Sequence, residues 1–133
     1  MRLALFTLLL LLTTSCHTQR RTFSVSFGSG GGVTGNAVMY SLSSDGKITK
    51  TSTFTKVATP ITTLSKKEMG KIILLATTAK LDTLKINNPS NMSNYLDLQI
   101  DSIMSHQIWS GTSSGNASLD SLFNLLNAFV KSK

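Results

Sequence analysis

Beyond residue 22, apolar and polar residues alternate with a period of two, which is typical of strands that bury one face. The apolar positions are Phe23, Val25 and Phe27 in a first strand and Val38, Tyr40 and Leu42 in a second. The glycine-rich stretch 28–32 ends the first strand, and Asp45 with Gly46 favours a tight hairpin after the second. A third strand, rich in threonine, is predicted over residues 48–57, so that the three form an antiparallel meander.

A helix is predicted over residues 65–80, after Pro60 closes the meander. Ser65 and Glu68 fit a capping box, in which the serine oxygen accepts from the glutamate amide and the glutamate accepts from the serine amide. Apolar residues then recur at helical spacing at Met69, Ile72, Ile73, Ala76 and Ala79.

The second half of the chain predicts another hairpin and a C-terminal helix. A strand over residues 96–100 turns near Asp101 and Ser102 and returns over 104–109, with loops at 87–91 and 111–115. The helix has an apolar face of Leu119, Leu122, Phe123, Leu126, Phe129 and Val130. The order βββαββα predicts an α+β fold, an antiparallel sheet of about five strands with two helices packed on one face. Residues 23–133 are expected to form one domain.

The N-terminal segment has the organisation of an export signal. Arg2 provides a positive start, residues 3–12 are an apolar run, and residues 13–15 are small. The apolar run is too short for a membrane-spanning helix, which needs about 18 residues. We therefore expect residues 1–15 to be removed as a signal peptide.

Cys16, the single cysteine, follows this segment directly. Residues 1–16 resemble the lipobox of bacterial lipoproteins, in which a small residue precedes an invariant cysteine. The resemblance implies cleavage between Ser15 and Cys16, a thioether-linked diacylglycerol on the thiol, and acylation of the freed amine. Each buried methylene contributes about 0.8 kcal/mol, so two or three acyl chains anchor a protein stably. Residues 16–22 would be the lipidated cysteine and a tether. The alternative is ordinary secretion with a free thiol.

The chain is basic, with 13 Lys and Arg against 6 Asp and Glu and a formal net charge of +7. Such an excess would suit nucleic acid, but Arg20 and Arg21 are the only arginines after the signal, and the lysines are scattered. The predicted export of the protein is a further argument against nucleic-acid binding. Beside an anchor at Cys16, the two arginines would rest on anionic lipid headgroups, which contributes about 1 kcal/mol each.

Two glycine motifs match enzyme signatures but lack their context. Gly30, Gly32 and Gly35 fit GxGxxG, yet a strand follows, where a pyrophosphate needs a helix N-terminus. Ser113 lies in a GxSxG match with Gly111 and Gly115, yet no histidine follows it to act as a base.

Single side chains offer little more chemistry. His106 is the sole histidine of the folded part, so we expect an exposed strand residue and no zinc site. Tyr40 and Trp109, near loop ends, could anchor a partner, although large aromatic residues more often belong to a core. The sequence predicts no enzyme activity, no cofactor and no metal.

Residues 27–35 resemble the SGGFxG segment of emfourin-type inhibitors of thermolysin-like metallopeptidases, and the order of elements is similar. Three glycines match, and Val33 stands where the family has phenylalanine. A group of small bacterial lipoproteins of unknown function is also similar, through FSVSFGSGGG near the mature start. The resemblance makes this loop the candidate partner-binding element. Its residues are Gly28, Gly30, Gly31, Gly32, Val33 and Gly35.

These patterns predict a membrane-anchored small lipoprotein of the bacterial cell envelope. It would lie on the exported side of the cell membrane or the outer membrane, and it would be a non-enzymatic binding module for an envelope protein or a peptidase. The alternative is a structural envelope protein whose basic surface contacts anionic lipid or polymer.

Overall fold

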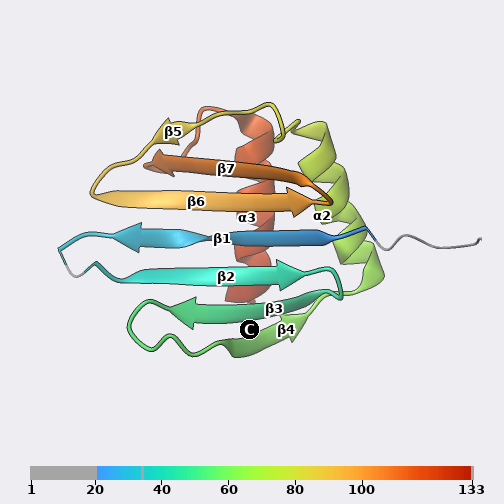
Figure 1. Cartoon of the computed structure of the whole chain (residues 1–133), viewed down its shortest axis with the longest axis horizontal. Helices are drawn as coiled ribbons and strands as arrows, with labels where there is room; N and C mark the ends of the chain where they lie inside the picture. The colour runs from blue at the N-terminus through green and yellow to red at the C-terminus, as the bar shows by residue number, and fades with distance from the viewer. Residues whose placement is uncertain (1–20, 34, 133) are drawn as a thin grey trace, which may run out of the picture.

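The computed structural model describes residues 21–33 and 35–132, which form two helices packed against one seven-stranded sheet (Figure 1). The strands are β1 (Phe23–Gly31), β2 (Ala37–Ser43), β3 (Lys47–Ser52), β4 (Thr59–Thr63), β5 (Asn87–Asn88), β6 (Met92–Ile100) and β7 (Ile103–Ser110). The helices are α2 (Lys66–Thr78) and α3 (Ala117–Lys131). The predicted signal peptide, Cys16 and the tether as far as residue 20 lie outside the described residues.

The strand order in the sheet is β4-β3-β2-β1-β6-β7-β5. Neighbouring strands are antiparallel, except that β5 pairs with β7 in parallel. The predicted α+β class with two helices is confirmed. The prediction of about five strands, all antiparallel, is only partly right, because β4 and β5 were not predicted and β5 makes the sheet mixed.

Strand boundaries differ from the prediction in β1, β3 and β6, and β6 begins at Met92 instead of residue 96. The first strand continues through the glycine-rich stretch to Gly31, because Gly28 and Gly30 pair with β2 on one side and β6 on the other. The third strand ends at Ser52 instead of residue 57, and Pro60 lies inside β4 instead of closing the unit. A proline is tolerated there because β4 is an edge strand, where a missing N–H need not break the sheet.

The two helices form where they are predicted. Ser65 caps α2: its Oγ accepts from the Glu68 amide at 3.3 Å, and Glu68 Oε2 accepts from the Ser65 amide at 2.7 Å. Asn116 caps α3 by accepting from the Leu119 amide at 3.0 Å. Among the described residues, neither helix combines the length and apolar character that crossing a membrane requires.

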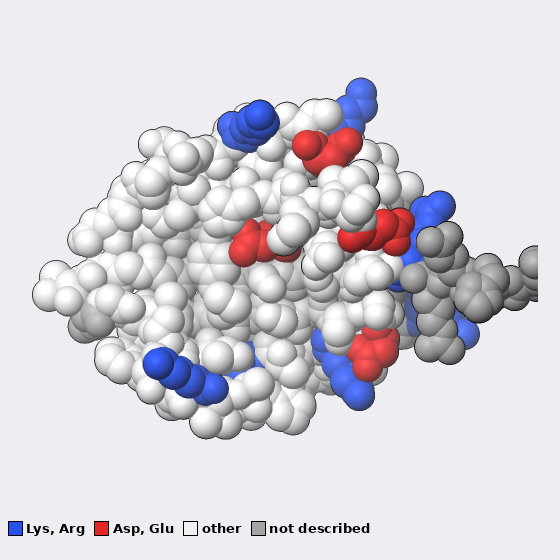
Figure 2. Space-filling view, viewed as in Figure 1, with Lys and Arg blue, Asp and Glu red and all other residues white. Residues whose placement is uncertain are grey.

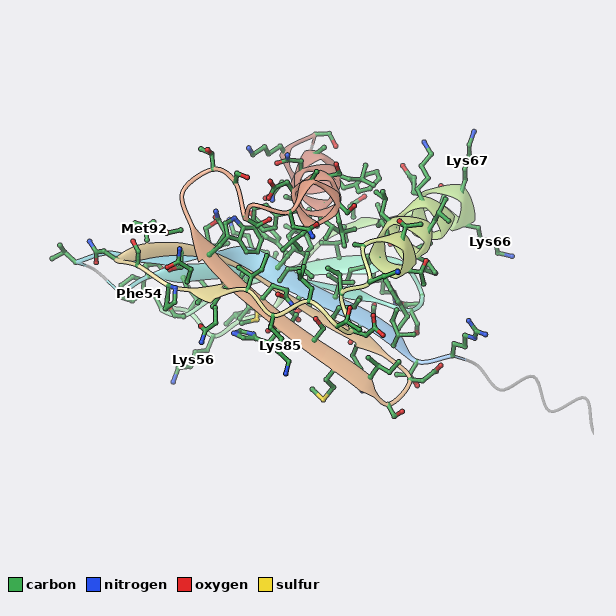
Figure 3. All side chains as sticks on the ribbon, turned by 90° about the horizontal axis from the view of Figure 1, so that it is seen from above. Phe54, Lys56, Lys66, Lys67, Lys85 and Met92 are labelled. Carbon is green, nitrogen blue, oxygen red and sulfur yellow. The ribbon has the colours of Figure 1, made fainter. Side chains whose placement is uncertain are left out.

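The hydrophobic core lies between the helices and one face of the sheet, and Figure 3 shows both helices on that same face. Trp109 is buried there and packs edge-on against Phe123, with 4.9 Å between ring centroids. Tyr40 stacks on buried Phe27 at 5.4 Å. Both aromatic residues therefore belong to the core. The other face of the sheet carries no helix of the described chain.

The chain enters the sheet at a fixed point. The Thr22 amide donates to Asp101 Oδ1 at 3.0 Å, and the Asp101 amide donates to the Thr22 carbonyl at 2.7 Å. Thr22 is thus bound to the β6–β7 turn and is not part of a free tether. The described chain begins at this end, on the right in Figure 1.

Candidate functional site

Three connections meet at the opposite end of the sheet, on the left in Figure 1: those between β1 and β2, β3 and β4, and β5 and β6. These connections and the first residue of β6 expose large apolar side chains, which we call the distal tip: Val33, Phe54, Val57 and Met92. Val33 is fully exposed, Phe54 is 69% exposed and Met92 is 55% exposed. Figure 3 shows Phe54 and Met92 together at this end.

Hydrogen bonds tie the connections of the distal tip to one another. The Gly32 amide donates to the Asn91 carbonyl at 2.6 Å, which joins the β1–β2 and β5–β6 connections. Asn36 Oδ1 accepts from the Ser52 and Thr53 hydroxyls, both at 3.2 Å, which joins the β1–β2 connection to the end of β3. The connections that carry the apolar side chains of the distal tip are therefore hydrogen-bonded to one another.

Gly31 and Gly32 allow the close approach at the tip. Gly31 has φ 116°, and a Cβ there would lie 2.1 Å from the Asn91 carbonyl oxygen. Gly32 has φ 79°, and its Cβ would lie 3.2 Å from the Met92 sulfur. Both backbone conformations are ones that residues with a side chain rarely adopt.

The distal tip is almost uncharged. The described residues of the three connections contain one charged side chain, Lys56, among Ser, Thr, Asn and Gly. Figure 2 shows this end as largely uncharged surface, whereas charged atoms gather toward the end where the chain enters. An apolar, uncharged surface on ordered loops is suited to recognising another macromolecule.

The predicted binding loop is only partly at this tip. Gly32, Val33 and Gly35 lie in the β1–β2 connection and Gly31 is the last residue of β1, but Gly28 and Gly30 are inside the sheet. Phe54, Val57 and Met92 were not singled out in the sequence. Phe54 and Val57 were predicted to lie in a strand that ends at residue 57. Because β3 ends at Ser52, both residues lie in a loop instead.

The uncovered face of the sheet contains a second feature, a shallow groove of about 420 Å³. We call it the sheet groove. The residues lining it come from β1, β6 and β7 and are Ser24, Ser26, Asp97, Leu98, Gln99, Met104, Ser105 and His106. At its centre, His106 Nδ1 bonds to Asp97 Oδ1, since these two residues are direct cross-strand partners. A carboxylate only accepts, so the imidazole donates from Nδ1 and offers Nε2 to a ligand.

Tyr95 lies across the sheet beside this groove. It faces Gly28 on β1, and a Cβ on that glycine would lie 2.6 Å from the phenol oxygen. The Tyr95 hydroxyl donates to the Val38 carbonyl on β2 at 3.0 Å, so the ring spans from β6 over β1. Burial, with a smaller contribution from the Asp97 charge, raises the pKa of Tyr95 to about 12.

The described residues do not assemble a nucleophile with its base. Asp97 lies between Ser26 and His106 in the sheet, and the Ser26 hydroxyl lies 3.3 Å from the Ser41 hydroxyl and not against the imidazole that would activate it. Ser113 of the GxSxG match donates to Asp120 Oδ2 at 2.6 Å and holds the loop before α3. Desolvation opposes ionisation of Asp120, but hydrogen bonds from Ser113 and Ser114 outweigh it and lower the pKa of this carboxyl.

Within residues 21–33 and 35–132, no three His, Cys, Asp or Glu residues cluster as a metal site would require. No protein-family model matches the chain, and comparison with curated proteins finds no significant match.

Proposed function

We propose that this protein is a lipoprotein of the bacterial cell envelope, anchored through Cys16, whose distal tip binds a folded partner protein. The distal tip is the observation that carries the proposal. It combines exposed apolar side chains from separate connections with hydrogen bonds that hold those connections in place. Loops ordered before binding lose less conformational entropy when the complex forms.

The direction of the tip supports an anchored binding module. The chain enters β1 at one end of the sheet, and the distal tip lies at the other end (Figure 1). An anchor at Cys16 would hold the entry end near the membrane. The tip would then project away from the lipid, toward soluble or surface proteins of the envelope.

A thermolysin-like metallopeptidase is the partner class that we test first. The support is the likeness of residues 27–35 to the inhibitor segment, because Gly31, Gly32, Val33 and Gly35 of that segment stand at the tip. An uncharged apolar tip would suit a cleft with apolar subsites. The assay titrates the soluble fragment 18–133, which retains every described residue, against such a peptidase and measures residual peptide cleavage.

Substitutions at the tip provide the decisive comparison. Phe54→Ser and Met92→Ser should each weaken inhibition about tenfold or more, the loss expected at a buried contact of an interface. Leu74→Ser is the matched control, because Leu74 is also an exposed apolar residue, 64% exposed, but lies on α2. No inhibition at high micromolar fragment would exclude this peptidase class. Equal effects of all three variants would exclude the tip as the binding surface.

A second candidate function uses the exposed side of α2. Lys66, Lys67 and Lys71 lie on it near Leu74, and Figure 3 shows Lys66 and Lys67 at the end where the chain enters. This surface would suit a structural envelope protein that contacts anionic lipid or polymer. Binding of fragment 18–133 to anionic vesicles should then weaken steeply between low and physiological salt, whereas binding at the apolar tip should change little.

A further inference from the structure

We propose that the sheet groove binds an uncharged oligosaccharide chain lying across β1, β6 and β7. The proposal concerns a different face from the distal tip and does not depend on the partner that the tip binds. It follows from the side chains that line the groove, from the ring of Tyr95 beside it, and from the charge balance of this face.

The groove offers the hydrogen-bonding groups that hydroxyl-rich ligands need. Ser26, Asp97 and His106 stand in one cross-strand row, and Ser24 and Gln99 stand in the next. Between them they provide hydroxyl, carboxamide, carboxylate and imidazole groups, which together donate and accept. Strands lie about 4.8 Å apart, so the three strands present these groups over roughly 10 Å. A flat row of mixed donors and acceptors matches a sugar ring with hydroxyls around its edge.

Apolar surface lies at both ends of this polar patch. Tyr95 precedes Asp97 by two residues on β6 and so lies on the same face, with the hydroxyl end of its ring against Gly28. A tyrosine ring that crosses the neighbouring strand provides aromatic surface on which the C–H side of a sugar can pack. Met104 lies at the other end and is 78% exposed, which provides a further apolar contact.

The charge of the groove favours an uncharged ligand. Asp97 and His106 bond to each other, so the carboxylate already has a hydrogen-bond donor within the groove. The eight residues lining the groove include no lysine or arginine. Figure 2, which looks onto this face, shows mainly uncharged surface around it. A phosphate or sulfate group would therefore find no cation here other than His106, whereas a neutral glycan needs none.

The test is a titration of ¹⁵N-labelled fragment 18–133 with N-acetylchitotetraose and with cellotetraose, followed by amide chemical shifts. We expect saturable shifts at Ser26, Asp97 and His106 with at least one of the two glycans. Asp97→Asn and His106→Ala change exposed side chains and should weaken binding about tenfold, with unchanged thermal midpoints. Thr49→Ala is the matched control, since Thr49 stands in the same cross-strand row but on β3, outside the groove.

Failure of this proposal is separable from failure of the proposed function. No saturable shift with either glycan at millimolar concentration would overturn it, as would shifts that the Thr49 control weakens as much as the groove variants do. Phe54→Ser should leave glycan binding unchanged, and His106→Ala should leave peptidase inhibition unchanged. A loss of both activities in either variant would show that the two surfaces are one site and would overturn the proposal.

Discussion

Gly28 and Gly35 belong to the same glycine-rich stretch, but the structure requires a glycine at the two positions for different reasons. Gly28 has an ordinary strand conformation, yet a Cβ there would lie 2.1 Å from the Val38 carbonyl oxygen and 2.6 Å from the Tyr95 hydroxyl. Gly35 has open space around it, and only its φ of 63° opposes a side chain. The stretch therefore contains glycines needed for close approach and glycines needed for a turn.

This difference leads to a prediction for two alanine variants. Gly28→Ala should lower the free energy of unfolding by about 1–3 kcal/mol, because backbone must move to admit the methyl group. Gly35→Ala should cost about 1 kcal/mol, the penalty of the left-handed conformation alone. Urea unfolding measures both. A Gly28→Ala variant as stable as the parent protein would mean that Tyr95 does not cross β1 as described.

The sequence could not separate these glycines, because the groups that crowd Gly28 are distant in the chain. Tyr95 lies on β6, well beyond the hairpin that contains Gly28. A local pattern shows only that glycine permits turns, so the whole stretch was assigned to a loop. The Asp97–His106 pair was not predicted for a related reason: His106 was expected to be an exposed strand residue, but only the exact register of the β6–β7 hairpin places Asp97 opposite it.

The raised pKa of Tyr95 predicts how stability changes in alkali. The folded state holds the phenol proton to about pH 12, whereas an unfolded tyrosine loses it near 10. Between these values the unfolded state binds fewer protons, so the contribution of Tyr95 is complete below pH 10 and is lost as pH rises to 12. In a Tyr40→Phe background, phenolate absorbance should report a midpoint near 12. A midpoint near 10 would contradict the buried position of the hydroxyl.

Among the elements, helix α2 was predictable because its signals are local. The cap at Ser65 and the carboxylate at Glu68 are three residues apart and bond to each other as the sequence indicates. Ser65→Ala should lower the free energy of unfolding by about 1 kcal/mol through loss of the cap. A urea midpoint that does not move, at constant slope, would contradict this. Ser44→Ala, in the exposed β2–β3 turn, is a control for a serine with no capping role.

Strand β5 shows what local signals cannot provide. It is two residues long, and its place beside β7 depends on Gln107, a fully buried side chain. Gln107 Oε1 accepts from the Ile86 amide at 2.7 Å, and its Nε2 donates to the Leu84 carbonyl at 2.6 Å. These bonds fasten residues 84–86 along the edge of β7. The sequence shows Gln107 as a polar residue in an otherwise apolar position, but it does not show which segment its side chain binds.

At the scale of the whole molecule, the chain has two ends with different properties. The entry end includes Arg21 and the N-terminus of α2, and the other end is the uncharged distal tip. Seven residue steps separate Cys16 from Phe23, a span of at most roughly 25 Å. A lipid on Cys16 would therefore keep the domain close to the membrane surface, with the tip as its outermost part.

This arrangement makes the modification of Cys16 the prediction on which the proposed orientation depends. Cys16→Ser should leave the protein unprocessed or released from the membrane fraction, because a serine hydroxyl is too weak a nucleophile to take the diacylglycerol. Intact mass spectrometry of the native protein should show an acylated N-terminal residue 16. Fragment 18–133 with the wild-type tip should still inhibit or bind in solution, since the described fold begins beyond the anchor. An unmodified thiol at residue 16 would leave the distal tip intact as a binding surface but would remove the membrane as the reason for its orientation.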